Sequence, residues 1–169
     1  YHNPITGEIF MFSKVYTAAL IGIDAHIIEV ETHMEGNVPA YSLVGLPDNA
    51  VRESRERVIA AIKNSGFPYM PQKRITINLA PADLKKEGSS YDLPIALGIL
   101  AAFGELDTEH IRNYLILGEL ALNGQLKPVH GSLSIAIEAE AKGFRGIIIP
   151  EANGIEAAMG TREIDIFPM

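Results

Sequence analysis

A lysine-rich loop followed by two serines is the segment of this sequence best suited to chemistry. It reads KKEGSSYD (residues 85–92) and leads into an apolar stretch with helical spacing. Free backbone N–H groups and the positive dipole at a helix start favour a bound anion, and two lysines would add charge. The segment therefore predicts either a phosphate contact at Lys85, Lys86 and Ser89 or a nucleophilic serine. A solvated loop with a helix cap is the alternative.

A second group of basic residues lies in the predicted helix and at the start of the predicted strand that precede this loop. It could follow a phosphate backbone in an otherwise acidic chain whose net charge is −7. Glu53 and Glu56 stand at i,i+4 spacing to two of the arginines, so a charged helix face with internal ion pairs is the alternative. The group comprises Arg52, Arg55, Arg57, Lys63, Lys73 and Arg74.

Several kinds of chemistry are excluded by missing residues. The chain has no cysteine, which excludes disulfides, cysteine-ligated zinc, iron–sulfur clusters and thiol catalysis. Its histidines are scattered with no H-E-x-x-H pattern, so we expect no metal site. No G-x-x-x-x-G-K-[ST], G-x-S-x-G or dinucleotide-type glycine pattern occurs. This stretch therefore has no ordinary means of binding ATP alone.

Periodicity predicts strands mixed with helices, and hence an α/β (α+β) fold with helices packed on a mixed sheet. Asp48 is a good N-cap for a helix that Gly66 ends, and Asn123-Gly124 predicts a hairpin turn. The further expected helices are residues 92–103, 131–142 and 153–159. The expected strands are residues 13–22, 23–33, 40–44, 74–81, 114–122, 125–129, 146–149 and 164–167.

The length of 169 residues fits one domain. We set residues 1–10 aside as a leader or expression remnant and expect a single domain over 11–169. The longest apolar stretch, Leu93 to Phe103, is about half of what a membrane-spanning helix needs. With no secretory signal pattern either, we expect a cytoplasmic protein without a membrane partner.

Four long segments closely resemble the magnesium-chelatase-like competence family (ComM, also called YifB). The resemblance runs from Met11 to about Ala158. The segments are YSLVGLPDNAVRESRERVIAAIKNSGF (41–67), RITINLAPADLKKEGSSYDLPIALGILAA (74–102), LGELALNGQLKPVHG (117–131) and GFRGIIIPEAN (143–153).

The resemblance implies a β-α-β fold of the type shared by Lon-protease domains and certain ribosomal-protein domains. It implies that residues 11–169 form the N-terminal domain of an AAA+ ATPase whose ATP- and Mg²⁺-binding module lies outside this chain. It also implies that the complete protein is a hexameric ATP-driven helicase that migrates DNA branches in natural transformation and recombination. We therefore expect DNA and further copies of the chain as partners, with this domain serving assembly or DNA contact.

The same resemblance raises a peptidase alternative. Lys86-Glu87-Gly88-Ser89-Ser90 places Ser90 at the Lon nucleophile position, with Ser89 where Lon has proline. Lon's partner lysine would fall within residues 129–137, which contain no lysine, and neither Lys127 nor Lys142 matches the pattern. A serine nucleophile needs a base. We therefore expect a degenerate, non-catalytic site, with a Ser–Lys peptidase and a pure oligomerisation module as alternatives.

Overall fold

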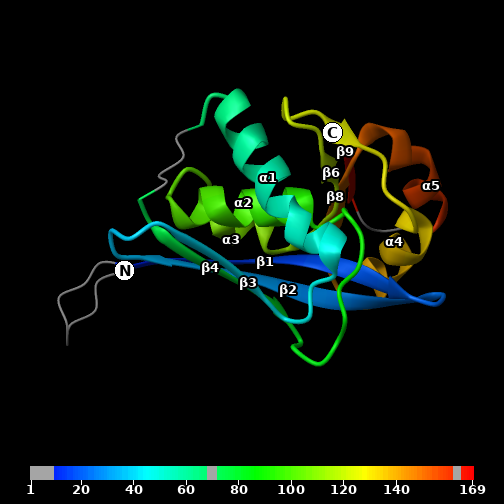
Figure 1. Ribbon diagram of the computed structural model, residues 1–169. Helices are drawn as coiled ribbons and strands as arrows, with labels where there is room; N and C mark the ends of the chain where they lie inside the picture. The colour runs from blue at the N-terminus through cyan, green and yellow to red at the C-terminus, as the bar shows by residue number, and fades with distance from the viewer. Residues whose placement is uncertain (1–9, 68–71, 162–164) are drawn as a thin grey trace.

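Strands β1 (Phe10–Ile21) and β2 (Asp24–Glu35) form a long antiparallel hairpin at the centre of a seven-stranded sheet. The computed structural model, shown in Figure 1, describes residues 10–67, 72–161 and 165–169. The sheet order is β3-β4-β2-β1-β5-β8-β9. The mixed sheet with packed helices confirms the α+β fold class.

Strand β4 (Arg74–Ala80) pairs antiparallel with β2 and parallel with β3 (Ala40–Val44). Its Ile75, Ile77 and Leu79 are buried on one face, as the alternation predicted. Helix α1 (Asn49–Asn64) follows β3, and Asp48 caps it by accepting the Val51 N–H at 2.8 Å. The predicted cap is confirmed.

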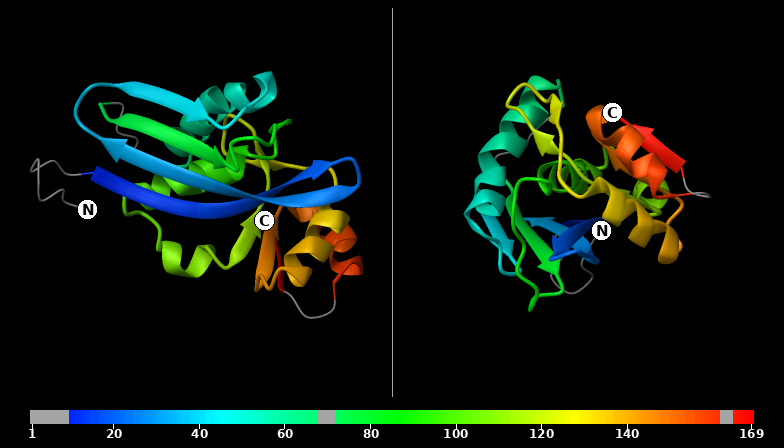
Figure 2. Two further views of the ribbon diagram at one scale, coloured as in Figure 1. Left: turned by 90° about the horizontal axis from the view of Figure 1, so that it is seen from below. Right: turned by 90° about the vertical axis from the view of Figure 1, so that its right-hand side faces the viewer.

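Two apolar cores lie on opposite faces of the sheet. Ile116 of β5 (Tyr114–Ile116) belongs to one core with α1 and helix α2 (Asp92–Ala102), whereas Leu115 belongs to the other. Helix α4 (Ser132–Ala141) packs in this second core against β8 (Gly146–Ile149). In Figure 2, the view from below shows the second face of β1, β2, β3 and β4 largely uncovered.

The predicted strand 114–122 divides into two. Residues of β5 join the main sheet between β1 and β8, whereas β6 (Glu119–Leu120) leaves the sheet and pairs with β7 (Leu126–Lys127). The Asn123-Gly124 turn is confirmed, but its hairpin is shorter than predicted. The chain turns away at Gly118, whose N–H donates to the Ser90 carbonyl at the start of α2.

The C-terminal part of the chain completes the second core. It contains the 3₁₀ turn η1 (Glu151–Asn153), helix α5 (Gly154–Met159) and strand β9 (Asp165–Pro168), parallel to β8. A short helix, α3 (Thr108–Ile111), was not predicted. The segment set aside as a leader lies outside the described residues except for Phe10, which begins β1. Within the described residues, no helix is long and apolar enough to cross a membrane.

Candidate functional site at the start of helix α2

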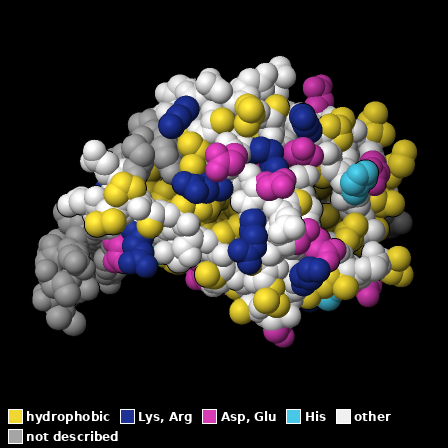
Figure 3. Space-filling view, in the orientation of Figure 1, with side chains coloured by type: hydrophobic (Ala, Val, Ile, Leu, Met, Phe, Trp, Pro, Cys, Tyr) yellow, Lys and Arg dark blue, Asp and Glu magenta, His cyan; other side chains and the backbone are white. Residues whose placement is uncertain are grey.

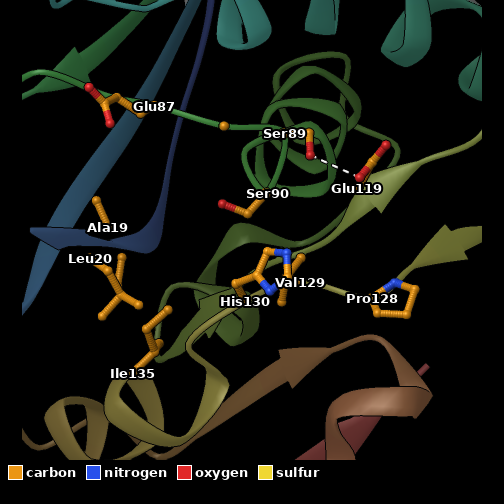
Figure 4. Close-up of a pocket in the computed structure, with 12 residues that line it drawn as sticks. Ala19, Leu20, Glu87, Ser89, Ser90, Glu119, Pro128, Val129, His130 and Ile135 are labelled. Atoms are coloured by element: carbon orange, nitrogen blue, oxygen red, sulfur yellow. Dashed lines mark hydrogen bonds between the residues drawn. The ribbon is translucent and has the colours of Figure 1, made fainter. Parts of the chain in front are cut away.

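The two predicted serines line a cavity of about 490 Å³ that begins where the 85–90 loop enters α2. β1 forms one wall, β6 another, and the segment before α4 closes the floor (Figure 4). The lining consists of Ala18, Ala19, Leu20, Glu87, Gly88, Ser89, Ser90, Glu119, Pro128, Val129, His130 and Ile135. Segments up to 117 residues apart in sequence (Ala18 to Ile135) therefore meet here.

The polar groups of this cavity have different roles. Ser89 Oγ donates a hydrogen bond to Glu119 Oε2 at 2.9 Å, which fixes that carboxylate on the wall. Ser90 also lines the cavity, and its side chain forms no hydrogen bond with another described residue. The exposed His130 lies across from it (Figure 4). The acidic groups of the lining are thus two glutamates, Glu87 and Glu119, which are unfavourable for an anion at Ser89.

The two predicted lysines point in different directions. Lys85 is exposed, and its Nζ lies 3.3 Å from a carboxylate oxygen of Glu87. Lys86 is fully buried and its Nζ donates to the Pro81 carbonyl. Burial lowers the pKa of the Lys86 ammonium, while Asp83 acts in the opposite direction. Of the two ammonium groups expected around an anion, only that of Lys85 faces solvent.

Lys86 is held inward by its own backbone. Its N–H donates to the Leu46 carbonyl at 3.0 Å, and its carbonyl accepts the Asp48 N–H at 2.9 Å. Asp48 adds a second tie, because its Oδ2 accepts the Gly88 N–H at 3.2 Å while Oδ1 caps α1. The loop is therefore fastened to the start of α1 and is not freely solvated.

The predicted basic residues lie in two separate places, one near the start of α1 and the other at the start of β4. Arg52, one turn into α1, donates from Nε to the carbonyl of Pro47, and Pro47 forms a β-bridge with Lys86, the neighbour of Lys85. Arg55 follows with its guanidinium 5.6 Å from the Tyr41 ring centroid. Lys73 and Arg74 stand at the start of β4, about 20 Å from the strand end that leads to the loop. On the surface shown in Figure 3, basic and acidic side chains are interspersed.

Arg57 does not contribute to the basic surface. Its guanidinium forms two hydrogen bonds with Asp92, a fully buried carboxylate in the first turn of α2. Burial raises the pKa of Asp92, and the bonds from Arg57 and from the Leu120 N–H oppose that rise. The hydrogen bond to Asp92 raises the pKa of Arg57 in turn. The predicted ion pair with Glu53 is present at 3.7 Å.

Sequence reasoning missed Glu119 and His130 as parts of this cavity. No short-range spacing links them to the serines, because β6 and the segment before α4 reach the site only through the sheet topology. Among the described residues, no group of three His, Asp or Glu side chains could hold a metal ion.

Comparison with known proteins places the chain in a family. Residues 30–153 match the family described as subunit ChlI of Mg-chelatase. The chain is 48% identical over 145 residues to competence protein ComM of Haemophilus influenzae, and 48% identical over 147 residues to YifB of Escherichia coli. This chain belongs to the magnesium-chelatase-like ComM/YifB family. The family match includes the whole cavity except its β1 wall.

The chain is short relative to these family members. The aligned regions cover 86% and 87% of this chain but only 28% of ComM and 29% of YifB. Weaker similarity extends to DNA repair protein RadA of Synechocystis, at 29% identity over 89% of this chain and 29% of RadA. It also extends to Lon protease of Protochlamydia amoebophila, at 23% identity over 70% of this chain and 15% of Lon.

Proposed function

We propose that this chain is a non-catalytic accessory module of a larger magnesium-chelatase-like ATPase that acts on DNA. The family assignment and the names of two relatives, a competence protein and a DNA repair protein, support this setting. The observation that carries the non-catalytic part is the burial of Lys86. This lysine is close to Ser90 in sequence, yet its amine is committed to the Pro81 carbonyl. Lys86 is therefore not available as a base for Ser90, and Lys85, which is paired with Glu87, does not line the cavity.

ATP hydrolysis in this proposal belongs to the part of the protein outside this chain. The 169 residues contain no P-loop, and the described ones offer no cluster of metal-binding side chains. ATP and Mg²⁺ therefore do not fit the residues present here. Assembly into a hexamer is the second element of the proposed role, and light scattering of the chain alone and joined to the ATPase module tests it.

DNA contact is proposed at the edge formed by the start of α1 and the loop after β4. Arg52, Arg55 and Lys85 are exposed there, and Asp48 fixes the two segments relative to each other. Because Glu53, Glu56 and Glu87 lie among these cations, we expect weak, salt-sensitive binding that adds to contacts made elsewhere in the complete protein. Lys73 and Arg74 would form a separate contact at the other end of β4.

Fluorescence anisotropy with single-stranded, duplex and branched DNA over a salt series tests this proposal. We expect binding that weakens with salt and a shallower salt dependence for the Arg52→Ala/Lys85→Ala variant. The matched control, Lys127→Ala/Lys142→Ala, removes two exposed cations from other elements and should bind as the parent does. No binding by the parent at low salt would contradict DNA contact by this module and leave assembly as its role.

A serine hydrolase is the second candidate, because Ser90 and His130 line the same cavity and Lon protease is among the relatives. In this alternative His130, rather than a lysine, would take the serine proton. Covalent labelling of Ser90 decides between the two candidates.

A further inference from the structure

A second groove runs along an open edge of strand β1. β1 pairs with β2 over its whole length, but its pairing with β5 is confined to Tyr16 opposite Leu115. Helix α3 lies beside the unpaired half of β1 (Figure 2). Between them is a groove of about 360 Å³, lined by Phe12, Ser13, Lys14, Tyr16, Thr108 and Arg112.

The strand presents an aromatic–basic–aromatic stripe to this groove. Phe12, Lys14 and Tyr16 alternate with the buried Ser13 and Val15, so their side chains share the outer face of the sheet. Phe12 is 51% exposed although it is large and apolar. Tyr16 is steadied at the other end by an edge contact with Phe144, at a centroid distance of 5.6 Å. An exposed ring on an uncovered sheet face can stack a flat ligand.

Two cations flank the groove from different elements. Lys14 comes from β1, and Arg112 follows α3, where it is exposed and forms no ion pair recorded among the described residues. Lys14 Nζ lies 3.7 Å from Glu29 Oε2, but both side chains are about 40% exposed, so this pair contributes little energy and can yield to a ligand. Both cations and Thr108 line the same groove.

Acidic side chains lie on both sides of the stripe, Glu29 and Glu31 on β2 and Asp107 and Glu109 at α3. On β2, Glu31 stands opposite Lys14 and Glu29 opposite Tyr16, and Glu31 accepts a hydrogen bond from Asn78 of β4 at 3.0 Å. Carboxylates can accept hydrogen bonds from the amino and imino groups of bases but repel phosphates. Lys14 and Arg112 therefore attract a phosphate backbone into the groove, and the carboxylates of β2 can accept hydrogen bonds from bases that point toward that strand.

We propose that this groove binds single-stranded DNA, with phosphates between Lys14 and Arg112 and a base stacked on Phe12. The inference rests on the proposed function, but it uses a surface separate from the edge that carries Arg52 and Lys85. Duplex DNA keeps its bases stacked within the helix and cannot place one on Phe12. Selectivity for unpaired strands follows from this difference.

Anisotropy titrations of the 169-residue chain with labelled oligothymidylate, oligouridylate and duplex DNA test the inference. We expect oligothymidylate to bind more tightly than the duplex and Phe12→Ala to weaken it about tenfold. Phe12→Tyr should retain binding. Lys14→Ala and Arg112→Ala should each lower the slope of log affinity against log salt by about 0.7. Phe67→Ala and Lys127→Ala, an exposed aromatic and an exposed cation elsewhere, should match the parent.

The outcomes separate this inference from the proposed function. Loss of binding only in Arg52→Ala/Lys85→Ala, with Phe12→Ala unchanged, would overturn the groove and leave DNA contact in place. Failure of the parent chain to bind any DNA would overturn both. Tighter binding of oligouridylate than of oligothymidylate would overturn the assignment to DNA.

Discussion

Arg57 of α1 holds the buried carboxylate of Asp92 in α2 with two hydrogen bonds, Nε to Oδ2 at 2.7 Å and Nη2 to Oδ1 at 3.0 Å. The same carboxylate accepts the Leu120 N–H of β6 at 3.0 Å, and Arg57 also donates to the Ala50 carbonyl at 2.9 Å. One ion pair thus joins α1, α2 and the wall of the candidate cavity. It fixes the position from which Ser89 and Ser90 enter the site.

Replacing Arg57 by alanine is expected to lower the free energy of unfolding by about 3–5 kcal/mol, because Asp92 would remain buried without its partner. Urea denaturation measures this change. Arg52→Ala is the matched control: its side chain is exposed, and we expect a change within about 0.5 kcal/mol. Similar losses for the two variants would show that the Arg57–Asp92 pair has no special role in stability.

The buried Lys86 predicts a stability that depends on pH in the alkaline range. Burial lowers its pKa in the folded state below the usual 10.5, so between these two values the unfolded chain binds the extra proton. The free energy of unfolding contributed by this residue therefore rises with pH in the window just below 10.5. Lys86→Met keeps the length of the side chain but removes the titrating group.

We therefore expect the difference in unfolding free energy between the parent chain and Lys86→Met to shift in favour of the parent as the pH approaches 10.5. Chemical denaturation at a series of pH values measures it. Lys85→Met, at the exposed neighbouring lysine, should give a flat difference. If the difference between the parent chain and Lys86→Met is also independent of pH, the ammonium of Lys86 is solvated in the folded parent.

Asp48 is expected to act on two segments at once. Asp48→Ala removes the α1 cap, at a cost of about 1 kcal/mol, and also frees the Gly88 N–H. Hydrogen exchange should show faster exchange at Gly88 as well as in the first turn of α1. Asp107→Ala removes a comparable cap from the short, exposed α3 and should leave Gly88 unchanged. If the Gly88 amide remains protected from exchange in Asp48→Ala, its hydrogen bond to Asp48 does not hold the loop in place.

Ser90 is expected to remain unlabelled by a fluorophosphonate probe in the folded chain. The reason is that Lys86 is turned away and no hydrogen bond from Ser90 Oγ to a base is recorded among the described residues. Mass spectrometry of the treated chain, with Ser90→Ala as control, provides the measurement. Labelling that disappears in both Ser90→Ala and His130→Ala would establish the hydrolase candidate and overturn the non-catalytic proposal.

Features that depend on neighbouring residues could be predicted from the sequence. The Asp48 cap, the Asn123-Gly124 turn and the alternating burial of β4 all follow from interactions within a few positions of the chain. Long contiguous motifs likewise sufficed for the family, since the match extends over residues 30–153.

Tertiary structure alone decided which of these residues meet. The inward turn of Lys86 depends on Leu46 and Asp48, and Asp92 receives its partner from 35 positions earlier in the chain. Glu119 and His130 reach the serines only because β6 leaves the sheet at Gly118 and α4 begins beside β1. Such contacts depend on how the sheet strands are ordered. Residue spacing constrains local conformation, but it leaves open which distant side chains share a cavity and which charges are buried.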